Sequence, residues 1–161
     1  MPILRWVRNV AETVRKVENL TALAALFGIA FAAATFIPAQ SEAALVGMQI
    51  AGYPVVLLIA VASLGNTLGA VVNWALGCGM QRFSGRRWFP VSPTSLDRAS
   101  AWYRRWGRWS LLLSWAPIGG DALTVAAGVL REPFWSFLAL VAIAKTGRYV
   151  ILSAVTVGLI G

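Results

Sequence analysis

Long runs of apolar residues alternate with short, broken segments along this chain. Two of the runs, residues 55–76 and 134–160, can each cross a bilayer as one helix, because a spanning helix needs about 20 residues. A third run, residues 20–37, stops at Pro38, and a fourth, residues 110–118, contains Pro117 and is too short to span alone. The pattern predicts two transmembrane helices, each preceded by an apolar segment that a proline ends or interrupts.

A carboxylate follows each of these breaks and is expected to begin a short helix. Glu42 begins one that runs to about residue 50, and Asp121 begins another that runs to about residue 130. Neither is long enough to cross, so we expect two re-entrant hairpins whose tips, near 38–42 and 117–121, dip into the bilayer. The residues that break the chain at the two tips are Pro38, Ser41, Pro117, Gly119 and Gly120.

Both halves of the chain carry these signals in the same order, which predicts an internal duplication. The expected fold is an all-α integral membrane protein of two repeats, each a re-entrant helical hairpin plus a transmembrane helix, with amphipathic surface helices. The first repeat covers residues 20–77 and the second covers residues 109–161. The residues that share an offset of 79 positions are Pro38 and Pro117, Glu42 and Asp121, and Pro54 and Pro133.

Composition sets the medium in which this fold must exist. Hydrophobic residues make up 58% of the 161 positions and charged residues only 12%, and the mean hydropathy is +0.70. A soluble domain of this size cannot bury so much apolar surface, whereas a bilayer accepts it. The single cysteine, Cys78, excludes an internal disulfide, and the absence of histidine removes the usual ligand of metals and proton relays. We therefore expect neither a metal nor a cofactor.

Residues 1–19 carry basic side chains beside apolar ones at helical spacing. Glu12 and Glu18 interrupt the positive charge and no small-residue cleavage site follows before Pro38, so an amphipathic helix on the membrane surface is favoured over a signal peptide. The net charge of +8 would also suit nucleic acid. Because the basic residues lie beside the apolar tracts, attraction to lipid headgroups explains the charge more simply, and no nucleic-acid partner is expected.

The connector of residues 78–108 is rich in arginine and tryptophan. A helix from Ser95 would carry Trp102, Trp106 and Trp109 beside basic residues, a mixture typical of the headgroup layer. The residues expected to contact headgroups are Arg104, Arg105 and Arg108. The positive-inside rule places this connector on the same side as the N-terminus, whereas two repeats place it on the opposite side, so its orientation stays open.

Two bases in the last apolar tract are the strongest candidates for chemistry. Lys145 and Arg148 lie one helical turn apart on one face. Charges inside a membrane cost several kcal/mol unless they are paired or hydrated, so they usually mark a pathway or a site. We expect Glu42 and Asp121 to face these bases across a polar cavity, although either acid could simply cap its helix. The corresponding helix of the first repeat adds two polar residues to this pathway, Asn66 and Asn73.

Several short motifs complete the pattern, and they are specific in combination although each alone is not. They are Phe36-Ile37-Pro38 with Ser41-Glu42, Gly65-Asn66-Thr67-Leu68-Gly69, Ser114-Trp115-Ala116-Pro117 with Gly120-Asp121, Ala127-Gly128, and Lys145 with Arg148-Tyr149. With these motifs the chain resembles the DedA superfamily, also called SNARE-associated or VTT-domain proteins, and most closely its short YqaA-type branch. The resemblance covers roughly residues 35–149.

The resemblance implies two opposed re-entrant hairpins and work on lipids, either phospholipid scrambling or recycling of an undecaprenyl-phosphate carrier, with coupling to the proton gradient. It also implies an acid in the first hairpin, which Glu42 matches, and arginines around the proline of the second hairpin. Ser114 and Gly120 stand in place of those arginines here. Lys145 and Arg148 are then expected to take over the binding of an anionic headgroup.

The leading hypothesis is a lipid translocator of the bacterial inner membrane. Its partners would be lipids with anionic or polyprenyl-phosphate headgroups, together with protons. A chain of this size gives few walls to a headgroup path, which favours a homodimer. An enzyme is not expected, since the acids are scattered and histidine is absent. The alternative is a membrane scaffold protein in which the buried charges form structural ion pairs.

Overall fold

The computed structural model describes residues 2–34, 39–79, 93–116 and 119–160. Its helices are α1 (Pro2–Ala33), α2 (Ala39–Ile50), α3 (Val55–Cys78), α5 (Pro93–Trp106), the 3-10 helix η1 (Gly107–Trp115), α6 (Gly120–Val129) and α7 (Phe134–Ile160). Helices and their connecting turns account for these residues, with no β-strand among them, which confirms the all-α class. The predicted breaks Pro38 and Pro117, and residues 80–92 of the connector, lie outside the described residues.

The predicted helices on either side of the breaks are present. By length and composition, α3 and α7 are able to cross a membrane, in agreement with the predicted spans of residues 55–76 and 134–160. The short helices α2 and α6 carry Glu42 and Asp121 in their first turns, as expected. Whether the segments around α2 and α6 re-enter the bilayer stays a prediction, because length and composition do not place them at any depth.

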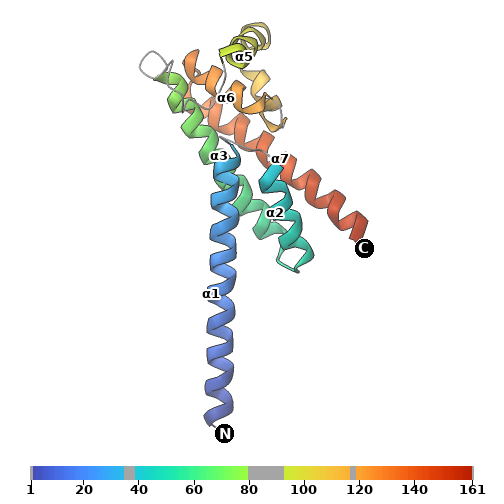
Figure 1. The fold of residues 1–161 in the computed structure, drawn as a ribbon. Helices are drawn as coiled ribbons and strands as arrows, with labels where there is room; N and C mark the ends of the chain where they lie inside the picture. The colour runs from blue at the N-terminus through green and yellow to red at the C-terminus, as the bar shows by residue number, and fades with distance from the viewer. Residues whose placement is uncertain (1, 35–38, 80–92, 117–118, 161) are drawn as a thin grey trace.

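The N-terminal helix is longer than expected. The sequence pattern predicts a surface helix that ends at residue 19, but α1 runs without a break from Pro2 to Ala33. Its last turns lie beside α3, while its N-terminal half extends away from the other helices (Figure 1). Residue 19 is therefore not the end of a helix, because nothing in the residues around it stops one: no proline or glycine occurs between Pro2 and Gly28.

The two long helices α3 and α7 pack against each other in opposite directions. Trp74, near the end of α3, packs against Phe134 and Phe137 at the start of α7, with the ring centroids of Trp74 and Phe134 5.4 Å apart. Leu58, near the start of α3, packs instead with Tyr149 in the second half of α7. The start of each helix thus lies by the end of the other.

The same backbone motif connects each short helix to the long helix that follows it. At the end of α2 the Tyr53 N–H donates to the Met48 carbonyl, and at the end of α6 the Glu132 N–H donates to the Ala127 carbonyl. The residue before each donor is left-handed, with φ of 87° at Gly52 and 57° at Arg131. These are Schellman helix ends, and each is followed by a proline that begins the next helix. The two corners are 79 residues apart, the offset of the sequence repeat.

Glycines let α3 approach its neighbours closely. A Cβ atom added at Gly65 would lie 2.5 Å from the Phe27 carbonyl oxygen, and one at Gly69 would lie 2.5 Å from that of Phe31. The small-residue pattern therefore faces α1. Further along α3, Gly77 is in backbone contact with α6. With α2 and α7 also packed on it, α3 is the central helix of the described structure.

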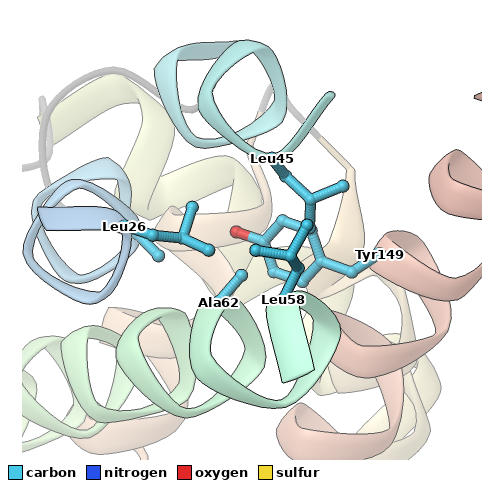
Figure 2. Packing of buried hydrophobic residues seen from close by; sticks show 6 residues of the cluster. Leu26, Leu45, Leu58, Ala62 and Tyr149 are labelled. Carbon is cyan, nitrogen blue, oxygen red and sulfur yellow. The ribbon is translucent and has the colours of Figure 1, made fainter. Parts of the chain in front are cut away.

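Buried apolar side chains fill the space that these contacts define. One group joins α1, α2, α3 and α7, and Figure 2 shows the ring of Tyr149 projecting into the middle of it. Its members are Leu26, Ala30, Leu45, Leu58, Ala62 and Tyr149. Two further groups pack α5, η1 and α6 against α3 and α7.

The Trp-rich connector is divided differently from the prediction. Helix α5 ends at Trp106, and Gly107, with a left-handed φ of 62°, begins η1. Arg108 and Trp109 consequently belong to η1, so the predicted boundary at residue 108 falls inside a helix. The cause is local, because a glycine at a left-handed position ends an α-helix readily.

Replacing Gly69 by alanine should lower the stability of the fold. The added methyl group would meet the Phe31 carbonyl oxygen at 2.5 Å and the Ala34 methyl group at 2.6 Å, and such overpacking costs about 1–3 kcal/mol. Thermal unfolding in one detergent, followed by tryptophan fluorescence, measures the change. Gly28→Ala is the matched control, since a Cβ atom there has no neighbour within 4 Å. Equal melting temperatures for the two variants would contradict the close α1–α3 contact.

Candidate functional site

Two acids, at the starts of α2 and α6, lie close to two bases on α7. Glu42 lies in the first turn of α2 and Asp121 in the first turn of α6, where the positive end of the helix dipole stabilises a carboxylate. Lys145 and Arg148, three residues apart, share one face of α7. One helix therefore presents both bases, and each short helix presents one acid to it.

The four residues form two ion pairs. The Nε and Nη2 atoms of Arg148 both lie 2.6 Å from Oε1 of Glu42, with Nε donating a hydrogen bond to it. The Nζ atom of Lys145 donates to Oδ1 of Asp121 at 3.1 Å. The side chains of the bases are only 7% and 3% exposed, whereas those of Glu42 and Asp121 are 33% and 26% exposed. The bases are enclosed and the carboxylates cover them from the outside.

This arrangement corrects one expectation from the sequence. The acids were expected to face the bases across a polar cavity, but both pairs are in direct contact. The physical reason is that a charge removed from water is costly, so a buried base draws its counter-ion to hydrogen-bonding distance. The role of the four residues as a lipid or ion pathway remains a prediction.

Tyr149 joins the first ion pair to a buried chain of hydrogen bonds. The Asn66 Nδ2 group donates to the Tyr149 hydroxyl at 2.9 Å, and that hydroxyl donates to Ser41 Oγ at 3.0 Å. All three residues are buried. Ser41 directly precedes Glu42, and Tyr149 directly follows Arg148. These hydrogen bonds therefore fix the position of the ion pair from both sides. Ser41, predicted only as a break in the chain, thus has a bonding role.

Asn73, the other predicted asparagine, lies elsewhere. Its Nδ2 group donates to the carbonyl oxygen of Ala34 at 2.7 Å, which satisfies a backbone acceptor just after the last turn of α1. Within the described ranges no hydrogen bond connects Asn73 with the four charged residues. Asn73 therefore holds the end of α1 on α3, and only Asn66 joins the candidate site.

A second polar cluster, centred on Glu132, was not predicted. The Tyr103 hydroxyl donates to Oε2 of Glu132 at 2.5 Å, and Nε of Arg108 lies 3.8 Å from Oε1. The Trp74 indole N–H donates to the Glu132 carbonyl oxygen at 3.2 Å. Burial and the adjacent carboxylate raise the pKa of Tyr103 well above its ordinary value, so its hydroxyl remains a donor. This cluster attaches α5 and η1 to the α6–α7 corner.

The predicted headgroup contacts have different environments. Arg104 and Arg105 are exposed on α5, and the guanidinium carbon of Arg105 lies 5.9 Å from the centroid of the Trp106 ring. Arg108 is also exposed, but it is paired with Glu132. Arg104 and Arg105 are thus available to headgroups, while Arg108 is shared with an internal acid.

Comparison with known proteins identifies the family. The VTT domain matches residues 37–157, which include both acids and both bases. The chain belongs to the VTT-domain family, also called the DedA family. As a VTT-domain protein with two helices of spanning length, it is an integral protein of the bacterial inner membrane.

The chain is also similar to curated VTT-domain relatives over most of their length. It is 37% identical to the inner membrane protein YqaA of Escherichia coli (strain K12) over 139 residues, which cover 84% of this chain and 91% of that protein. YqaA of Shigella flexneri matches with the same values. An uncharacterized protein of Haemophilus influenzae is 31% identical over 135 residues, covering 79% of this chain and 82% of that one. No solved structure matches the chain.

The structure brings together residues 114 and 120, the two positions at which the family resemblance implies arginines. A Cβ atom added at Gly120 would lie 2.5 Å from the backbone oxygen of Ser114, so the two positions are in direct contact. No larger side chain fits at residue 120 in this packing. The bases that remain next to the hairpin are on α7.

Tyr149 carries a signal that sequence reasoning could have used. It lies four residues after Lys145, so it shares a face with a buried base. A tyrosine at that position in an apolar helix favours a hydrogen-bonded hydroxyl. Glu132 had no comparable signal, because it stands at a helix end where an exposed carboxylate is ordinary.

Tyr149→Phe should destabilise the protein by about 1–3 kcal/mol, because it removes two buried hydrogen bonds and leaves the Asn66 amide unsatisfied. Thermal unfolding measures the loss. The control is Tyr53→Phe, since the Tyr53 hydroxyl has no hydrogen bond within the described residues. A melting temperature for Tyr149→Phe equal to that of Tyr53→Phe would show that the buried chain of bonds does not form.

Proposed function

We propose that this VTT-domain protein is a membrane lipid translocator that moves lipids with a phosphate-bearing headgroup. The observation that supports this most directly is the pair of ion pairs that connect Glu42 and Asp121 to Lys145 and Arg148. Both bases belong to a helix of spanning length and are nearly enclosed. Ionisable groups at such positions are costly and usually line a path for a polar substrate.

The geometry favours competition as the mechanism. A lipid phosphate is an oxygen anion like a carboxylate, so it can replace Glu42 on Arg148 or Asp121 on Lys145. The carboxylates are the more exposed partners, so an incoming anion has to displace a carboxylate before it reaches the enclosed base. A displaced carboxylate loses its counter-ion and tends to take up a proton, which gives a simple route to proton coupling. The headgroup would pass along α7 while the tails stay in the bilayer.

The arrangement of the helices supports two inverted repeats. The α2–α3 and α6–α7 corners share one hydrogen-bond motif, and α3 and α7 run in opposite directions. On this proposal the segments before α2 and α6 re-enter the bilayer from opposite faces. Irregular backbone at depth is tolerated only where protein covers it, and the contact of Gly120 with Ser114 provides such cover.

Buried polar atoms add a further argument. Oδ1 of Asn66, Oγ of Ser63 and Oγ of Ser153 are buried and have no hydrogen-bond partner among the described residues. Such groups are ordinarily satisfied by water. They lie on α3 and α7, and Asn66 is bonded to the residue that follows Arg148. Water at these atoms would place a hydrated path beside the ion pairs.

The second candidate function is a scaffold in which the same ion pairs are structural. The direct contacts and the near-complete enclosure of both bases favour it. A structural ion pair needs only two opposite charges in contact. A translocation site needs the base on α7 and the acid on the short helix, because the substrate approaches the pair from the side of the acid. The two functions therefore differ in their response to exchange of the charges.

Glu42→Gln should reduce the movement of fluorescently labelled anionic lipid in proteoliposomes more than tenfold. Glutamine carries no charge, so it cannot compete with the phosphate for Arg148, and it cannot take up a proton when it is displaced. A loss of this size corresponds to about 1.4 kcal/mol in the barrier. Glu18→Gln, at an exposed position of α1, is the control and should keep full activity. Elution as a folded species on gel filtration separates lost activity from lost structure. Full activity in folded Glu42→Gln would exclude the acid from the mechanism.

Exchanging Asp121 and Lys145, as Asp121→Lys with Lys145→Asp, tests whether this ion pair takes part in lipid movement or only stabilises the fold. The ion pair can form again, so the exchange should recover most of the stability that either single variant loses. A translocator should remain below a tenth of the normal rate of lipid movement, because the base has left α7. Recovery of both stability and lipid movement would favour the structural role.

A further inference from the structure

An apolar groove lies beside α5, and none of the four residues of the ion pairs lines it. Helix α5, η1 and the start of α6 enclose a hollow of about 350 Å³, within the range of about 300–1,000 Å³ typical of small-molecule sites. A second hollow, of about 240 Å³, lies between α5 and η1. The two hollows adjoin, because Trp102 and Leu113 line both of them, and we refer to them together as the groove.

The groove is open because α5 exposes large aromatic side chains directly beside its buried side. One side of the helix is buried, with Leu96 and Ala99 in the apolar group that packs on α6. The adjoining side keeps large aromatic residues exposed, with Trp102 52% and Trp106 58% exposed, and Trp109 of η1 is 66% exposed. Exposed aromatic surface of this extent marks an interaction site, and tryptophan prefers the boundary between lipid and water.

Positive charge borders the groove. Arg98 lines the larger hollow and takes part in no ion pair with another described residue. Arg105 lies seven residues further along the helix, on the same side as Arg98, and stacks on Trp106. The acid on α5 is Asp97, which is exposed and does not line the groove. An anion held at Arg98 would therefore have apolar surface directly beside it.

We propose that this groove binds one anionic phospholipid of the surrounding bilayer, with a tail against Trp102 and Leu113 and its phosphate at Arg98. The combination of a tryptophan-lined apolar channel and a bordering cation matches the two chemically different parts of such a lipid. A free anion would not fill the apolar part of the groove, and a lipid whose phosphate is balanced by its own ammonium group would be attracted less strongly to Arg98. Because the protein lies in the inner membrane, the bilayer supplies the ligand.

The position of the groove connects it with the proposed function. Gly119 and Gly120 line its far end, and the next residue is Asp121 of the second ion pair. A lipid bound there would lie next to Asp121, at the predicted tip of the second hairpin. This role as the place where the substrate is taken up rests on the proposed translocation, whereas the binding itself does not.

Photolabelling in vesicles tests the binding without using transport. The complete protein is reconstituted with phosphatidylglycerol that carries a diazirine in its acyl chain, and labelled residues are mapped by mass spectrometry. Phosphatidylcholine with the same chain is the comparison lipid. Labels from phosphatidylglycerol should map to α5, η1 and the start of α6, at least threefold above those from phosphatidylcholine.

Two variants and one control sharpen the test. Arg98→Gln should reduce labelling of the groove by phosphatidylglycerol at least threefold and leave labelling by phosphatidylcholine unchanged. Arg131→Gln removes an exposed charge at the corner between α6 and α7, which lines neither hollow, and should change labelling by neither lipid. Leu113→Trp, at a position 40% exposed, fills the junction of the two hollows and should reduce labelling by both lipids. Unfolding temperatures identify any variant that fails to fold, and Arg98 and Leu113 give two independent readings.

Equal labelling of the groove by both lipids, or labelling that is unchanged in Arg98→Gln, would overturn the proposal. An unlabelled groove in a protein that still moves lipid would overturn the groove alone. A selectively labelled groove in a protein that moves no lipid would leave the groove in place and overturn the proposed function.

Discussion

The structure depends on placing two positive charges inside an apolar helix bundle. The side chains of Lys145 and Arg148 are almost fully enclosed, so their charge has to be balanced by other groups of the protein. Each short helix provides one carboxylate from its first turn, where the helix dipole already favours an anion. This requirement fixes how α2 and α6 meet α7, and it explains why both helices begin at the level of the bases.

Other contacts in the described structure hold the helices around these ion pairs. Glycines on α3 allow close contact with α1 and α6, and Tyr149 connects the first ion pair to α3 through Asn66. The Glu132 cluster attaches the tryptophan-rich α5 and η1 at the opposite corner. The same charges that stabilise the bundle are the ones proposed to exchange with a lipid phosphate, so stability and function are expected to compete at these positions. The groove on α5 lies outside this competition, because none of its lining residues belongs to the pairs.

Sequence reasoning found the elements and the charges but not how they are joined. The spans, the short helices and the partners of Lys145 could be predicted, because they follow from apolar length, from chain-breaking residues and from the cost of a charge in lipid. The direct contact of the pairs, the position of Asn73 at the end of α1 and the cluster around Glu132 could not. Those features depend on the packing of helices far apart in sequence, and on a left-handed Arg131 where a glycine would be usual. The continuous α1 was misjudged because a change from charged to apolar residues does not by itself end a helix.

Solid-state nuclear magnetic resonance in liposomes tests the central claim most directly. The chain contains two lysines, Lys16 and Lys145, and two aspartates, Asp97 and Asp121, so ¹⁵N-lysine and ¹³C-aspartate labels isolate the pair once Lys16→Arg and Asp97→Asn are introduced. The separation of 3.1 Å between Nζ and Oδ1 predicts strong dipolar dephasing of the Lys145 amine by the Asp121 carboxyl carbon. Absence of dephasing in the folded protein would mean that the bases are balanced in some other way, and the account of the site would fail.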